Sequence, residues 1–184
     1  MKFKIVYKSI GGADNLGNRI QFNNYTLREA VNLWCNNQEQ ARTKYGDINE
    51  WDVSQVNDMS QLFSEKNNFN SNIANWNTSN VTNMRSMFSR ARSFNQDISN
   101  WNTSRVTNMI YMFSGATSFN NGATNDDPNH SLLTYGDAWN TSSVTNMEGM
   151  FSRASSFNQD ISNWNTSNVT DMRSMFFEAS SFNQ

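Results

Sequence analysis

The chain has 184 residues and a formal net charge of −2, and only 16% of its residues are charged. Without a basic surplus, binding to nucleic acid through phosphate neutralisation is excluded as the default interpretation. Aromatic residues make up 13% of the sequence, which argues against an asparagine-rich disordered chain, and the length suits one domain.

Residues 1–46 are predicted to form an N-terminal cap made of a strand and an amphipathic helix. The sequence FKIVYKS indicates an edge strand. The helix is expected to begin at Thr26, which has the spacing of a capping box with Glu29, and to end at Gly46. Its apolar face would consist of Leu27, Ala30, Val31 and Trp34.

The N-terminus does not have the pattern of an export signal. Its apolar run is short and is interrupted by Tyr7, Lys8 and Ser9. No segment approaches the roughly 20 apolar residues that span a bilayer. We therefore expect no membrane span, and an intracellular location or a place within an assembled particle is favoured over secretion.

The rest of the chain, residues 47–184, is built from repeats. Five tryptophans are separated by 25, 25, 38 and 25 residues: Trp51, Trp76, Trp101, Trp139 and Trp164. Each tryptophan is followed by valine after five residues, methionine after eight, and phenylalanine after twelve and eighteen. A fixed period of this kind is typical of a solenoid, in which each unit buries its apolar face against its neighbours.

Within one repeat, the spacing of apolar residues favours a short helix followed by an extended return. The second repeat shows both patterns, the helical one at Val81, Met84, Met87, Phe88 and Ala91 and the extended one at Phe94 and Ile98. We therefore predict an α/β fold, a right-handed, leucine-rich-repeat-like solenoid of five strand–helix repeats with an N-terminal helical cap.

The repeat sequence NWNTSNVTNMRSMFSRARSFNQ resembles the 25-residue repeat of the BspA-like family. This family is a relative of the leucine-rich-repeat proteins and is known from bacterial, mycoplasmal and protist surface proteins, and similar repeats occur in large DNA viruses. The resemblance covers about residues 47–184. It implies a non-catalytic role in adhesion or protein interaction.

An insertion at residues 122–135 interrupts the third repeat and contains the only proline and the only histidine of the chain. Asp126, Asp127 and His130 are of metal-ligand types, but a lone DDxxH motif lacks the convergent donors that a metal requires, so no metal site is expected. The segment is either a solvated loop or a partner-binding loop. Its candidate contact residues are Asp126, Asp127, His130, Leu132, Leu133 and Tyr135.

Two further places are candidate contact surfaces. Ile110 and Tyr111 stand where other repeats have polar residues, so they are either exposed for a partner or covered by the insertion. At the end of the sequence, no polar cap follows the last repeat, and Phe177 replaces the usual serine. This uncapped end is interpreted either as a chain cut short or as a face that docks on another subunit.

No catalytic or cofactor site is expected. One histidine and one cysteine, far apart in sequence, cannot supply a nucleophile with its base, and there is no glycine-rich phosphate loop. The sequence therefore predicts a non-enzymatic structural or protein-interaction scaffold in a larger assembly, such as a virion. A cell-surface adhesin is the alternative, and a less favoured one is ice binding through Thr78, Thr103, Thr141 and Thr166.

Overall fold

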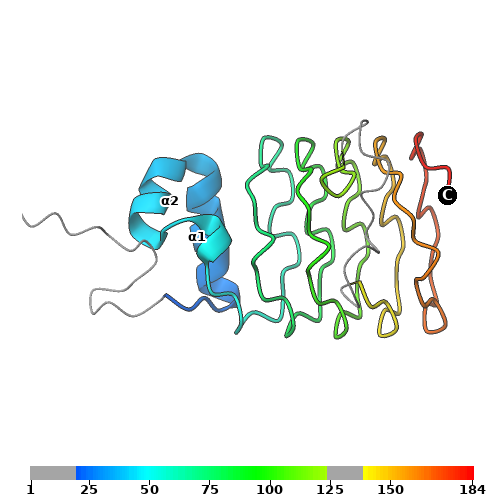
Figure 1. Cartoon of the computed structure of the whole chain (residues 1–184), viewed down its shortest axis with the longest axis horizontal. Helices are drawn as coiled ribbons and strands as arrows, with labels where there is room; N and C mark the ends of the chain where they lie inside the picture. The colour runs from blue at the N-terminus through cyan, green and yellow to red at the C-terminus, as the bar shows by residue number, and fades with distance from the viewer. Residues whose placement is uncertain (1–19, 124–138) are drawn as a thin grey trace, which may run out of the picture.

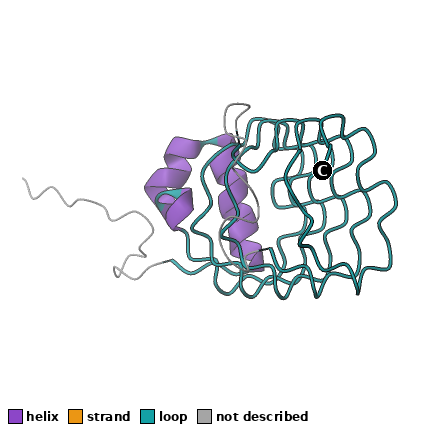
Figure 2. Cartoon of the chain, turned by 45° about the vertical axis from the view of Figure 1, so that its right-hand side comes forward, coloured by secondary structure: helices purple, strands orange, loops and turns teal. Residues whose placement is uncertain are grey.

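A computed structural model describes residues 20–123 and 139–184. Two helices, α1 (Asn24–Asn36) and α2 (Gln38–Tyr45), and a short 3-10 helix, η1 (Ile48–Glu50), come first. The repeats follow as a stack of coils, one coil per repeat, with the helices at one end and the C-terminus at the other (Figure 1). No β-strand is present in the described part of the chain (Figure 2).

The predicted amphipathic helix is in fact two helices. Helix α1 starts earlier than expected, because the Asn23 side chain accepts hydrogen bonds from the backbone of Tyr25 and Thr26 and forms the capping box with Thr26. The non-helical backbone of Asn37 then separates α1 from α2, and the Asn37 side chain caps α2. The expected buried face is confirmed: Leu27, Ala30, Val31 and Trp34.

The helices cover the first coil through aromatic contacts. The ring of Trp51 lies 5.0 Å from Phe22, 5.7 Å from Trp34 and 5.8 Å from Tyr45, measured between ring centroids. The backbone N–H of Phe22 also donates to the carbonyl of Asp52. The expected strand FKIVYKS lies outside the described residues, and the boundary between a cap and the repeats at residues 46 and 47 stays a prediction.

The prediction of strand–helix repeats is wrong. In the described residues the coils are runs of turns, and successive coils are joined by isolated parallel bridges: Asp58 to Asn83, Asn83 to Asn108, Asn108 to Asn146, and Asn146 to Asp171. The bridges lie in a different part of the coil from the extended return that the sequence favoured at Phe94 and Ile98. The fold is therefore not the α/β solenoid expected from the sequence.

The segment that was expected to be helical explains the error. Met87 donates its backbone N–H to the carbonyl of Met84, and Ala91 donates to Phe88, each three residues back. Consecutive turns of this kind place residues three apart on the inner side, as a helix does. Between these bonds, the N–H groups of Ser86 and Phe88 donate to the next coil, which no helix would allow.

Aromatic side chains form continuous columns through the interior. In the column of Phe63, Phe88, Phe113, Phe151 and Phe176, successive ring centroids are 5.3, 5.4, 5.6 and 5.7 Å apart and the ring planes are within 9° of parallel. A second column runs beside it: Phe69, Phe94, Phe119, Phe157 and Phe182. Each coil therefore contributes equivalent side chains to one shared core.

Several buried polar groups are also paired from coil to coil. The indole N–H of Trp76 donates to the carbonyl of Ile48 at 2.7 Å, and Trp101 donates to Ile73 at 3.1 Å. Beside the indoles, the buried hydroxyls of Thr78, Thr103 and Thr141 donate to backbone carbonyls of the following coil. These bonds fix the register in which coils stack, because a shifted coil would leave buried donors unmet.

Replacing Thr141 by valine should lower the free energy of unfolding by about 1–2 kcal/mol. The Thr141 hydroxyl is buried and donates to the carbonyl of Asn165 at 3.0 Å, and valine keeps its shape but removes the donor. Urea denaturation of the two proteins measures the difference. Valine is sterically acceptable in this column, since the first coil carries Val53 there. An unchanged stability would show that this hydrogen bond contributes nothing.

Candidate functional site

The last coil ends the stack with a surface that we call the terminal face, made of Met172, Ser174, Phe176, Phe177 and Glu178 with the outer side of Phe182. Met172 is 44% exposed, whereas the equivalent Met59, Met84, Met109 and Met147 are 0% exposed. Phe177 is 51% exposed, and the guanidinium of Arg153 lies over its ring at 5.6 Å from the centroid. The terminal face is therefore the place where the core pattern of the repeat reaches the surface.

The coils stack with a fixed hydrogen-bond polarity. Along one edge, four backbone N–H groups of each coil donate to carbonyls of the next; in the fourth coil they are those of Met147, Gly149, Phe151 and Arg153. The equivalent N–H groups of the last coil belong to Met172, Ser174, Phe176 and Glu178, and no described residue accepts from them. The terminal face thus presents a row of four hydrogen-bond donors.

The opposite end of the stack presents carbonyls, and Arg28 of helix α1 binds two of them. The guanidinium of Arg28 donates to the carbonyls of Asp58 and Ser60 and forms an ion pair with the Asp58 carboxylate at 3.1 Å. Burial alone would raise the pKa of Asp58, but hydrogen bonds from Ser60 and Asn83 together with Arg28 hold it below its usual value. The charged form of Asp58 is therefore favoured here, and its ion pair with Arg28 ties helix α1 to the first coil.

Ile110 and Tyr111 do not form a freely exposed pair. Both are half-buried, and the Tyr111 hydroxyl donates to a carboxylate oxygen of Glu148 at 2.7 Å, which raises the pKa of Tyr111. The Tyr111 ring lies over Gly149, which in the neighbouring coil takes the place held by serine at Ser86 and Ser174. Tyr111 is therefore occupied in contacts between coils, whereas Phe177 is the candidate residue that the structure leaves most exposed.

The candidate residues of the insertion lie outside the described residues: Asp126, Asp127, His130, Leu132, Leu133 and Tyr135. In residues 20–123 and 139–184, no three side chains of His, Cys, Asp or Glu come together as a metal site would require. The threonine column on which ice binding would depend is mostly interior, because Thr78, Thr103 and Thr141 are buried and only Thr166 is exposed. That column offers no flat surface to a lattice.

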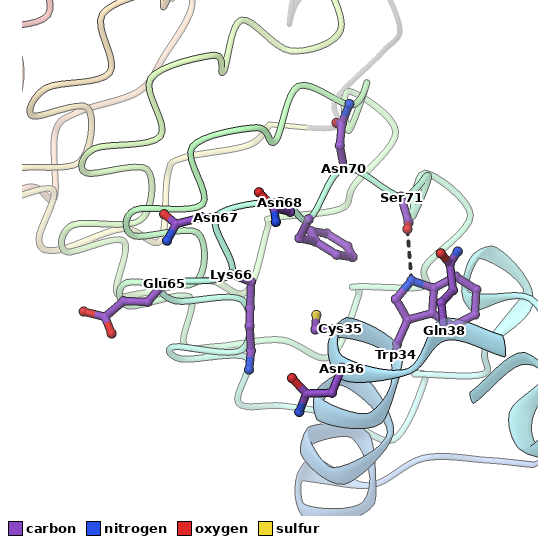
Figure 3. Close-up of a pocket in the computed structure, with 11 residues that line it drawn as sticks. Trp34, Cys35, Asn36, Gln38, Glu65, Lys66, Asn67, Asn68, Asn70 and Ser71 are labelled. Atoms are coloured by element: carbon purple, nitrogen blue, oxygen red, sulfur yellow. Dashed lines mark hydrogen bonds between the residues drawn. The ribbon is translucent and has the colours of Figure 1, made fainter. Parts of the chain in front are cut away.

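A concave pocket lies between α1 and the first coil (Figure 3). It has a volume of about 560 Å³ and is lined by Cys35, Lys66, Phe69 and several amide side chains. At its rim the indole N–H of Trp34 donates to the Ser71 hydroxyl at 2.9 Å. Burial raises the pKa of the Cys35 thiol, with Lys66 acting weakly in the opposite direction, so the thiol is protonated and a poor nucleophile at neutral pH.

The sequence pointed to the terminal face only in part. The unusual Phe177 could be identified from the sequence, but the donor row could not, because periodicity shows which side chains face inward and says nothing about the direction of N–H groups. The contribution of Arg28 was also missed. Its side chain reaches the first coil across 30 residues of sequence, and no local pattern marks that contact.

The class of protein defined here is a repeat protein built from stacked, turn-based coils, with helices packed against the first coil. The chain belongs to the family described as "Mycoplasma protein of unknown function, DUF285", which it matches over residues 32–133 and 129–184. No curated protein and no solved structure is detectably similar to it. In the described part of the chain, no helix has the length and apolar character needed to cross a membrane.

Proposed function

We propose that the chain is a non-enzymatic, BspA-like scaffold that binds another protein and so takes part in a larger assembly. The observation that carries this proposal is one exposed aromatic side chain: Phe177 is 51% exposed at a position where the four preceding coils carry serine. Exposed aromatic surface of this kind favours association with another protein.

The distribution of polar groups supports the same proposal. Threonine and asparagine side chains along the sides of the stack bond to backbone groups of neighbouring coils, as the Thr107 hydroxyl does with the carbonyl of Thr82 at 3.2 Å. The Asn158 amide oxygen likewise accepts from the backbone of Asn183 at 2.9 Å. These side chains hold the scaffold together, whereas the exposed ring of Phe177 makes no such contribution and is left to contact a partner.

The test is capture of a partner by the tagged full chain from an extract of the organism that encodes it, with quantitative mass spectrometry. We expect Phe177→Ser to reduce capture about tenfold, because the exposed ring would be lost from the interface. Arg85→Glu is the matched control, since Arg85 is exposed on a side of the stack, and it should capture as the unaltered chain does. Equal capture by Phe177→Ser, or capture of nothing by any form, would refute the proposal.

A further inference from the structure

We infer that the pocket between helix α1 and the first coil binds a small acidic sugar, meaning a saccharide that carries one carboxylate. Three features of the pocket lead to this inference: the residues at which the first coil departs from the repeat, a lysine without a counter-ion, and a group of carboxamides without partners. The pocket lies at the first coil, away from the exposed ring of Phe177, and the inference does not depend on the proposed function.

The first coil departs from the repeat where it lines the pocket. Lys66 stands at a position where the other four coils carry a buried alanine: Ala91, Ala116, Ala154 and Ala179. Asn68 stands where the same coils carry serine: Ser93, Ser118, Ser156 and Ser181. Figure 3 shows the Lys66 side chain extending from the first coil toward helix α1. The pocket therefore receives a cation and a carboxamide where the repeat would supply a methyl group and a hydroxyl.

Lys66 has no counter-ion in the described part of the chain. Glu65 supplies the one carboxylate among the described residues that line the pocket, and it pairs with Arg90 of the next coil at 3.0 Å. The positive charge of Lys66 is therefore left for a ligand with a negative charge. A phosphate monoester carries about −1.5 to −2 at neutral pH and is best held by the fork of an arginine, so a single carboxylate suits a lone lysine better.

The carboxamides around the pocket are also without partners. Elsewhere in the stack such groups join one coil to the next, as the Asn95 amide oxygen does by accepting from the backbone of Asn120 and Gly122 at 2.8 and 3.0 Å. At the pocket, four carboxamides bond to no described residue: Asn36, Gln38, Asn67 and Asn68. Each of them can both donate and accept a hydrogen bond, as a sugar hydroxyl can. The group therefore matches a ligand that is rich in hydroxyls.

The size and the aromatic residues of the pocket argue against an apolar ligand. Trp34 and Phe69 border it but are only 4% and 6% exposed, so they offer little ring surface to a ligand. The Trp34 indole N–H is already used by the Ser71 hydroxyl. The volume of about 560 Å³ lies within the range of small-molecule sites, about 300–1,000 Å³. A small saccharide held by hydrogen bonds fits this pocket, whereas a lipid chain does not.

A purely structural role for Lys66 makes a different prediction. Helix α1 has no basic residue in its last turn, so a cation near the carbonyl end of the helix is favourable without any ligand. If this were the whole role of Lys66, its replacement would lower the stability of the protein and the unaltered chain would bind no sugar. Ligand binding and stability must therefore both be measured.

Titration of the isotope-labelled full chain with sodium D-glucuronate, followed by NMR, tests the inference. We expect the side-chain amide signals of Asn36, Asn67 and Asn68 to shift, with a Kd of about 1 mM or below. D-Glucose should bind about tenfold more weakly, because it lacks the carboxylate that would pair with Lys66. Lys66→Ala, which introduces the residue of the other coils, should weaken glucuronate binding about tenfold for the same reason.

The matched control is Arg85→Ala, since Arg85 is an exposed cation on a side of the stack, and it should bind glucuronate as the unaltered chain does. Shifts that are absent up to about 50 mM glucuronate would overturn the inference. Equal affinity for glucose, or an unchanged affinity in Lys66→Ala, would overturn it as well. Tighter binding of glucose 6-phosphate would identify a phosphorylated ligand instead. If urea denaturation shows a loss of stability in Lys66→Ala while the unaltered chain binds no sugar, Lys66 only balances the charge of the helix end.

Discussion

Replacing Phe113 by alanine should lower the free energy of unfolding by about 3–5 kcal/mol. Phe113 is 0% exposed, and its ring centroid lies 3.9 Å from Phe119, 5.4 Å from Phe88 and 5.6 Å from Phe151. Alanine would leave a cavity at the centre of the stack, bordered by rings from three coils. The neighbouring columns cannot close it without breaking the hydrogen bonds that hold the coils in register.

Urea denaturation followed by tryptophan fluorescence measures the effect. Because each coil contacts only its neighbours, the substitution should also weaken the coupling between the two halves of the stack and lower the dependence of the unfolding free energy on urea. Phe177→Ser is the control, since the ring of Phe177 is exposed and serine is the usual residue there; it should change stability by about 0.5 kcal/mol or less. A loss below about 1 kcal/mol for Phe113→Ala would contradict the stacked core.

The core was predictable from the sequence, and the backbone was not. Regular spacing of tryptophan and phenylalanine identified the side chains that pack together, and rings such as Phe88 and Phe113 do stack with ring planes 3° apart. The same spacing of Met84, Met87 and Phe88 fits either a helix or a run of turns, because both bring every third residue inward. Only the direction of the N–H groups separates the two, and side-chain patterns do not encode it.

Positive backbone φ angles show why turns replace the helix. In the second coil Ser86 and Arg90 have φ values of 54° and 59°, and the equivalent Ser174 and Glu178 of the last coil have 56° for both. These residues are not glycine, so the sequence carried no warning of left-handed backbone. The cost of such angles is offset by the hydrogen bonds that they direct toward the next coil, including those that leave the terminal face with unmet donors.

Gly149 is the second position where we expect a large loss of stability on substitution, because the Tyr111 ring of the neighbouring coil fills the space that a side chain at position 149 would need. Replacing Gly149 by alanine should lower the free energy of unfolding by about 2–4 kcal/mol, part from overpacking and part from the positive φ. A Cβ atom at this position would overlap Cε1 and Cδ1 of the Tyr111 ring, and the φ of Gly149 is 58°. Chemical denaturation of the single variants and of the double variant measures the cost and its origin.

The double variant Gly149→Ala with Tyr111→Ser separates the two contributions. Serine occupies the equivalent positions Ser86 and Ser174, so it removes the ring without introducing a foreign side chain. We expect the coupling energy between the two substitutions to exceed about 1 kcal/mol, with Tyr111→Ser reducing the loss of stability that Gly149→Ala causes.

Gly115→Ala is the matched control, because the φ of Gly115 is also positive, at 71°, but the atom nearest to an added Cβ, Cγ of Arg90, would lie at 3.4 Å. It should cost only the conformational part, about 1–2 kcal/mol. If Gly149→Ala costs no more than Gly115→Ala, the ring of Tyr111 does not lie over Gly149, and the tyrosine would be free for a partner, which is one of the two interpretations that the sequence left open.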